Sequence, residues 1–119
     1  MNELFSVIVP VYNSEKSLDE LCSRVRKVFD DQVKSDFEMI LVNDGSKDKS
    51  WEVMQKIHHQ DSRIKIINLA KNCGQHSAMM CGLNNFSGDY AIFMDDDLQH
   101  PPEELPKLIK HIRMHPDID

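Results

Sequence analysis

The chain has 119 residues, with 14 Lys or Arg against 20 Asp or Glu, and its formal net charge is −6. This length fits one domain, and an apolar fraction of 40% is typical of a globular protein. The acidic balance excludes a general nucleic-acid binder, because such proteins need a basic surface. The sequence also lacks an apolar run long enough to cross a membrane and the pattern of a secretory signal.

Cysteine usage indicates the cellular setting. The three cysteines, Cys22, Cys73 and Cys81, are odd in number and form no C-x-x-C pair. This pattern argues against a disulfide framework and against a zinc site. We therefore expect a reducing, cytoplasmic environment.

The first predicted elements are a strand at residues 5–11 and a helix over residues 18–29. The strand is a nearly continuous β-branched run, which is typical of a strand buried on both faces of a parallel sheet. The helix has apolar residues at helical spacing, and Ser17 and Glu20 predict a capping box at its start.

The middle of the chain repeats this alternation. A short apolar run predicts a second strand at residues 37–42, and Asp48 or a neighbour is expected to cap the helix that follows. That helix should bury Trp51, Met54 and Ile57. A third strand is predicted at residues 64–69, where Lys65 and Asn68 indicate a less buried, edge-like place.

The last elements are a weak helix, a strand and a final helix. Gly82 lies inside the predicted helix over residues 75–84, which weakens that prediction. The fourth strand, at residues 90–94, runs directly into three aspartates. A helix then follows two prolines, and Pro106 is compatible with its first turn.

Strands alternating with helices predict an α/β fold with a Rossmann-like, mostly parallel sheet and helices on both faces. In such a sheet ligands bind beyond the carboxyl ends of the strands. Each predicted strand is followed by a polar cluster, so all four clusters should meet at one rim: residues 12–15, 43–46, 71–75 and 95–99.

The cluster after the fourth strand also concentrates the charge. No Lys or Arg lies between Lys71 and Lys107, whereas six acids do, and the remaining chain carries 14 acids and 14 bases. Adjacent carboxylates raise one another's pKa unless a cation joins them. In an extended segment alternate side chains lie on the same side, so Asp95, Asp97 and Gln99 share one side and Asp96 points away.

The carboxylate oxygens predict a Mg²⁺ or Mn²⁺ site at Asp95 and Asp97, and His100 is a further candidate contact. The alternative is a solvated acidic loop that caps a helix. Asp44 could accept hydrogen bonds from a base or ribose, or simply form a turn. No glycine-rich dinucleotide or P-loop motif is present.

Four segments together carry a family resemblance: residues 7–13 (VIVPVYN), 41–46 (LVNDGS), 68–75 (NLAKNCGQ) and 94–103 (MDDDLQHPPE). In this order and spacing they resemble the inverting family 2 glycosyltransferases with the GT-A fold. The last two segments are similar to those of polyprenyl-phosphate sugar transferases, which act on dolichol or undecaprenyl phosphate. The resemblance spans essentially the whole chain.

The resemblance implies roles for the matching residues. The donor would be a nucleoside-diphosphate sugar, with the base and ribose framed by Pro10, Tyr12, Asn13 and Asp44. Gly45, Ser46, Lys71 and Gly74 would lie near the nucleotide. Asp95 and Asp97, the catalytic pair, would bind the metal and nucleotide with Gln99, while Asp96 holds the variable middle place. The family usually has Glu directly after Tyr-Asn; here Ser14 intervenes, and Glu15 is the candidate for that contact.

The implied reaction is transfer of the sugar with inversion, to a polyprenyl phosphate or to a saccharide hydroxyl. Because family members continue beyond this length, we expect residues 1–119 to form a truncated, donor-binding part that is inactive alone. The full protein could lie at the cytoplasmic face of a membrane. An unpaired edge on the fourth strand would invite self-association.

Two other functions use similar features. A nucleotidyltransferase also combines carboxylates with a metal, but no basic glycine-rich triphosphate loop is present. A non-catalytic nucleotide-binding or receiver-like interaction domain is the third possibility. Receivers place their acidic pair after the first strand, where this chain has Tyr12 and Asn13.

Overall fold

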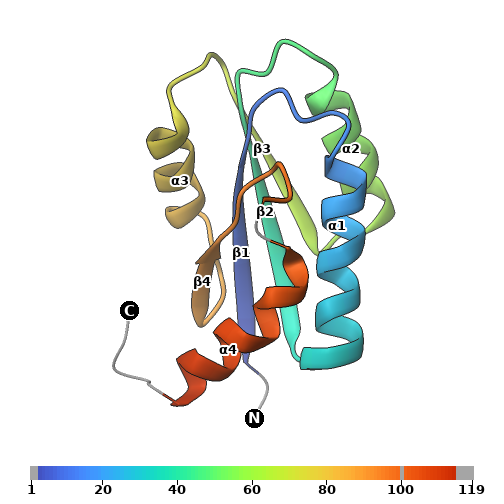
Figure 1. Cartoon of the computed structure of the whole chain (residues 1–119). Coiled ribbons are helices and arrows are strands. Elements are labelled where there is room, and N and C mark those ends of the chain that lie inside the picture. The colour runs from blue at the N-terminus through green and yellow to red at the C-terminus, as the bar shows by residue number, and fades with distance from the viewer. Residues whose placement is uncertain (1–2, 100, 115–119) are drawn as a thin grey trace.

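The computed structural model describes residues 3–99 and 101–114, and they form one parallel sheet flanked by helices (Figure 1). The strands and helices alternate as the sequence predicted. In chain order they are β1 (Leu4–Val11), α1 (Leu18–Lys27), β2 (Asp36–Asp44), α2 (Ser50–Gln60), β3 (Ile64–Leu69), α3 (Gln75–Leu83), β4 (Tyr90–Phe93) and α4 (Leu105–Met114).

The sheet order is β3-β2-β1-β4, and every pair of neighbouring strands is parallel. This arrangement confirms the predicted Rossmann-like α/β fold. It also places β3 at an edge, as Lys65 and Asn68 indicated. Within the described residues β4 forms the opposite edge, so the sequence-based expectation of an edge strand there is confirmed.

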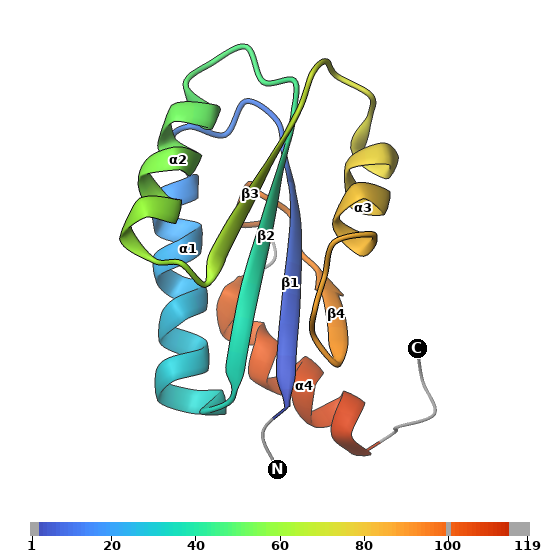
Figure 2. The same ribbon diagram turned by 180° about the vertical axis from the view of Figure 1, so that it is seen from behind.

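Helices cover the two faces of the sheet unequally (Figures 1 and 2). The larger apolar core lies under α1, α2 and α4, where Phe5, Val7 and Val9 of β1 point. The smaller core lies under α3 and contains Ile8 of β1. Alternate residues of β1 therefore face opposite cores, which is why the strand reads as a continuous apolar run.

Gly82 lets α3 approach the sheet closely. A Cβ atom at this position would collide with Cγ2 of Ile8, whose side chain is completely buried. The glycine that weakened the helix prediction is thus required by packing, and α3 extends through it to Leu83.

The predicted capping box at the start of α1 is wrong. Ser17 occupies the cap position, but its hydroxyl makes no capping bond and instead donates to the backbone oxygen of Asp96 at 2.7 Å. The helix also ends differently, because residues after Lys27 continue as a π-helical segment, Val28–Val33. At the start of α2 the cap position is Lys49, whose side chain makes no capping bond, while Asp48, one residue earlier, accepts the backbone N–H of Ser50, the first residue of α2, at 2.9 Å.

The end of the sheet opposite the polar rim contains a buried carboxylate. Glu38 of β2 is 5% exposed and accepts hydrogen bonds from Ser6 Oγ, Lys65 Nζ and Ser87 N, each at 2.6 Å. Gly88 N in turn donates to Ser6 Oγ at 2.9 Å. This network fastens the segment that leads into β4, the strand that delivers the three aspartates.

Candidate functional site

The loops after β1, β2, β3 and β4 meet at the carboxyl end of the sheet (Figure 1). They enclose a polar cavity of about 530 Å³, and all four loops or their flanking residues line it. The lining consists of Pro10, Val11, Tyr12, Asp44, Asn72, Gly74, Gln75, Asp95, Asp96, Asp97 and Gln99. The convergence that parallel topology predicted is therefore present.

Most of the predicted site residues line this cavity. They are Pro10, Tyr12, Asp44, Gly74, Asp95, Asp96, Asp97 and Gln99. Five others do not line it: Asn13, Glu15, Gly45, Ser46 and Lys71. Val11, Asn72 and Gln75 line the cavity without having been singled out, although all three adjoin or belong to the predicted polar clusters. His100 lies outside the residues that the structure describes.

Asn13 and Ser46 join the loop after β1 to the loop after β2. The backbone N–H of Asn13 donates to Ser46 Oγ at 3.0 Å, and Asn13 Oδ1 accepts the backbone N–H of Lys47 at 2.8 Å. Asn13 has positive φ, at 51°, a conformation that Asn tolerates better than most residues. These two residues hold the two loops together without lining the cavity.

Asp44 and Gly45 join the loops after β2 and β3. Asp44 is only 4% exposed, and its Oδ1 accepts the backbone N–H of Cys73 at 2.7 Å. Gly45 has a φ of 68°, and an added Cβ would collide with Asn72 N and lie 2.7 Å from the carbonyl carbon of Lys71. Only glycine allows this close approach of the two backbones.

Asp96 joins the loops after β1 and β4. Its Oδ2 accepts the backbone N–H of Tyr12 at 2.9 Å and also the hydroxyl of Ser14. The hydroxyl of Ser17 donates to the backbone oxygen of Asp96. Ser14, where the sequence departs from the family pattern, thus contacts the middle aspartate.

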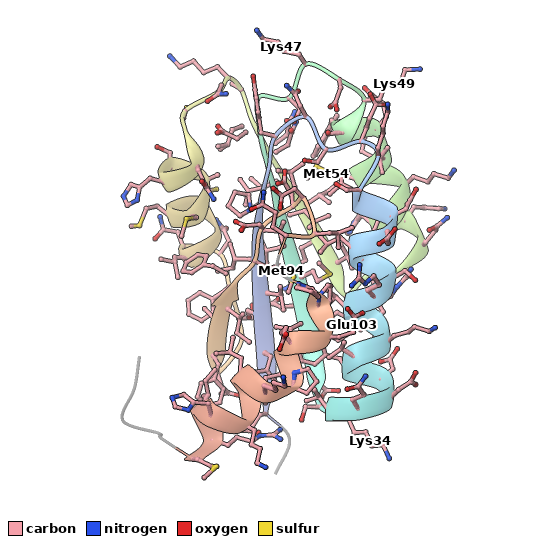
Figure 3. The ribbon with its side chains drawn as sticks, in the orientation of Figure 1. Lys34, Lys47, Lys49, Met54, Met94 and Glu103 are labelled. Carbon is pink, nitrogen blue, oxygen red and sulfur yellow. The ribbon has the colours of Figure 1, made fainter. Side chains whose placement is uncertain are left out.

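Glu15 and Lys71 lie apart from the polar cavity. Glu15 lines a neighbouring hollow of about 400 Å³, which it shares with Asp48 and Asp97. Its backbone N–H donates to Asp48 Oδ2 at 3.2 Å. Lys71 is exposed. Lys47, on the loop after β2, points outward beyond the rim (Figure 3).

The charged side chains that line the cavity are all acidic. Four of its lining residues are aspartates, and none of the lining residues in the described part of the chain is Lys or Arg. A bound diphosphate would therefore meet carboxylates without a protein cation to offset them. A divalent cation between the two would remove this repulsion.

The donor atoms at the acidic loop fit a hard cation. Asp97 is exposed, and its Oδ1 accepts the backbone N–H of Gln99 at 3.1 Å, in a turn where Leu98 has a φ of 63°. Asp95 is partly buried at the end of β4. Within residues 3–99 and 101–114, no three His, Cys, Asp or Glu side chains are grouped to hold a metal. Phosphate oxygens would have to complete the coordination, as Mg²⁺ and Mn²⁺ sites commonly allow.

A second, more apolar cavity of about 390 Å³ adjoins the first along β4. It is lined by Met79, Phe93 and Leu108, among others, and shares Pro10, Gln75 and Asp95 with the polar cavity.

No helix in the described part of the chain is both long and apolar enough to span a bilayer.

Comparison with protein families matches residues 6–118 to the family described as Glycosyl transferase family 2. The undecaprenyl-phosphate 4-deoxy-4-formamido-L-arabinose transferase of Edwardsiella ictaluri is 43% identical over 109 residues, or 91% of this chain and 33% of that protein. The protein of the same name from Photorhabdus laumondii is 46% identical over 106 residues, or 88% and 32%. The chain spans about a third of the length of these relatives.

Solved structures give the same fold. S. aureus TarS 1-349 superposes with a TM-score of 0.76 at 32% identity, over 97% of this chain and 33% of that one. TarS 1-349 in complex with UDP-GlcNAc gives 0.73 at 30% identity, over 97% and 32%. The mannosyltransferase PcManGT from Pyrobaculum calidifontis, in complex with GDP-Man and Mn²⁺, gives 0.79 at 18% identity, over 94% and 33%, which supports the fold alone.

Proposed function

Because the chain belongs to glycosyl transferase family 2, we propose that it binds a nucleoside-diphosphate sugar in the polar cavity with the help of Mg²⁺ or Mn²⁺. The chain would supply the donor-binding part of an inverting glycosyltransferase. A receiver-like domain and a nucleotidyltransferase are less consistent with this family membership.

The observation that carries the proposal is the cavity's charge. Four aspartates and no base line it in the described residues, so a diphosphate can enter favourably only with a cation. Asp95 and Asp97 would hold that cation together with Gln99. When bound, it would stabilise the negative charge on the departing nucleoside diphosphate.

The other walls suit the nucleoside. Tyr12 is 41% exposed and offers an aromatic face, while Pro10 and the buried Asp44 lie in the same lining. Asn13, Gly45 and Ser46 would act indirectly, by fixing the loops that carry the lining residues. Gly74, which precedes α3, lines the cavity near the expected phosphates.

The donor and acceptor are proposed from the relatives. The UDP-GlcNAc complex of TarS, 30% identical, supports a uridine diphosphate sugar. The names of the undecaprenyl-phosphate transferases support a polyprenyl phosphate acceptor at a membrane surface. An acceptor phosphate is already ionised and needs no strong base to attack the anomeric carbon as the bond to the diphosphate breaks. A saccharide hydroxyl, the alternative acceptor, would need one.

Calorimetric titration of the chain with UDP and GDP, with and without Mn²⁺, tests the donor proposal. We expect binding that requires Mn²⁺ and favours UDP, and at least a tenfold loss of affinity in Asp97→Asn. Asp36→Asn is the matched control, because Asp36 is exposed and starts β2 at the opposite end of the sheet. Unchanged affinity in Asp97→Asn would overturn the metal role, and absence of any nucleotide binding would overturn the donor site.

We also propose that copies of the chain associate through the edge of β4. Phe93, 41% exposed on that edge strand, supports this proposal. Sedimentation velocity over a concentration series tests it, with Phe93→Lys as the comparison. A monomer at every concentration would contradict it.

A further inference from the structure

We propose that Asp96 is a positioning residue that locks the loop after β1 onto the acid-bearing loop after β4. This inference rests on the proposed donor site. The resemblance gives Asp96 only the variable middle place between the two expected cation ligands. Its contacts assign it a task other than binding the cation.

The sheet itself does not hold these two loops together. The pairing of β1 with β4 ends at Ile8 and Phe93, followed by a bond from Met94 N to the oxygen of Ile8 at 3.0 Å. β1 continues for three further residues, to Val11. Beyond the ladder, the fastening between the two chain segments therefore depends on the loops.

Asp96 supplies this fastening through both its side chain and its backbone. Its Oδ2 accepts from Tyr12 N at 2.9 Å and from the Ser14 hydroxyl, and its backbone oxygen accepts from Ser17 Oγ at 2.7 Å. The three donors are spread over the whole connection between β1 and α1. The loop is thus held at its beginning, its middle and its end.

These bonds couple two parts of the donor site. Tyr12 and Asp96 both line the polar cavity, and Asp95 and Asp97 flank Asp96 in sequence. Holding Tyr12 against Asp96 fixes the aromatic wall relative to the two carboxylates expected to bind the cation. A donor molecule must contact both at once, so a loose loop would have to be ordered during binding at a cost in affinity.

Ser14 makes this arrangement electrostatically acceptable. Its hydroxyl donates to the carboxylate, whereas a second carboxylate at this position would face Asp96 with like charge. Serine at position 14 and aspartate at position 96 therefore form a complementary pair. The role of Asp96 should depend on its ability to accept hydrogen bonds more than on its charge.

The chain contains a matched control for a purely structural effect. Asp89 Oδ2 accepts the backbone N–H of Leu4 at 2.9 Å, the same kind of bond at the same distance. It joins the start of β1 to the residue before β4, at the end of the sheet away from the cavity. Asp89→Ala removes an equivalent bond without touching the rim.

The experiment combines amide hydrogen exchange with Mn²⁺-dependent UDP titration. In Asp96→Ala we expect faster exchange of the Tyr12 amide and about tenfold weaker UDP binding. Asp96→Asn keeps an oxygen acceptor for Tyr12 N and should recover most of the affinity. Asp89→Ala should speed exchange at Leu4 and leave UDP binding unchanged. Ser14→Ala, a milder change, should weaken binding about threefold and covers the case in which Asp96→Ala does not fold.

The outcomes separate this inference from the proposed function. UDP binding by Asp96→Ala equal to that of the wild type would overturn the inference alone. Asp96→Asn as weak as Asp96→Ala would also overturn it, because a direct cation ligand loses its charge in both variants. Failure of the wild type to bind UDP with Mn²⁺ would overturn the proposed function and this inference with it.

Discussion

Replacing the buried carboxylate Glu38 by glutamine should destabilise the fold in a pH-dependent way. Glu38 accepts one hydrogen bond on Oε1, from Lys65, and two on Oε2, from Ser6 and Ser87. A glutamine can turn its oxygen toward Ser6 and Ser87. Its amide NH₂ then faces the Lys65 ammonium, a donor against a donor.

The magnitude follows from these contacts. Lys65 is 48% exposed, so the lost ion pair is screened and contributes at most about 1 kcal/mol. The two retained bonds change from charged to neutral acceptors, a loss of about 1 kcal/mol each. Relief from burying a charge offsets part of this loss. We expect a net destabilisation of about 2 kcal/mol, or a fall in Tm of about 8 °C for a chain of this size.

The pH dependence has a definite sign. Burial opposes ionisation of Glu38, but the hydrogen bonds from Lys65, Ser6 and the Ser87 backbone outweigh it and lower its pKa below the usual value. A depressed pKa in the folded state gives stability that is present at neutral pH. This stability is lost as the pH falls below about 4.3, the ordinary value in an unfolded chain, and through the folded pKa.

Urea denaturation of wild type and Glu38→Gln at pH 7 and at pH 3 measures both effects. The difference in unfolding free energy should shrink at pH 3. Glu52→Gln, an exposed change in the first turn of α2, should stay within about 0.5 kcal/mol of the wild type at either pH. Equal stabilities at pH 7, or a difference of the same size at pH 3, would refute the reasoning.

Two glycines give further predictions. Gly45→Ala combines a positive φ with a collision against Asn72 N, so it should cost at least about 2 kcal/mol in urea denaturation and weaken UDP binding. Wild-type values for both would show that the two loops move apart freely. Gly82→Ala should cost about 1 to 2 kcal/mol, because overpacking against Ile8 exceeds the gain in helix propensity. Combined with Ile8→Ala, which removes the Cγ2 atom, Gly82→Ala should cost less than it does alone, and purely additive effects would contradict the collision.

Much of the fold could be predicted because it depends on patterns within short segments of the sequence. Residues 5–11 and 37–42 are mostly apolar on both faces, and this pattern indicated parallel strands covered by helices. Lys65 marked β3 as an edge strand. Ser17 was misread because its hydroxyl serves a tertiary contact to Asp96, which a local capping rule cannot anticipate.

For the candidate site too, some residues could be predicted from the local sequence and others depended on tertiary contacts. Asp44 ends β2, and Asp95 and Asp97 come shortly after the end of β4, so parallel topology placed all three at one rim. Glu15 was predicted in the same way, yet it lies in the neighbouring hollow because its loop turns toward Asp48. A residue that follows a strand can thus be predicted to lie at the rim, but the path of its loop decides whether it faces the cavity.

The bonds that shape those paths join residues distant in sequence. Tyr12 and Asp96 are 84 residues apart, and Asn13 and Ser46 are 33 apart. Neither pair has a spacing or motif from which its hydrogen bond could be predicted. Side chains that looked secondary in the sequence, such as the middle aspartate and the serine after Tyr-Asn, therefore fix the geometry in which the more recognisable carboxylates can act. Substitutions at such positions should change donor affinity while leaving every recognisable motif residue in place.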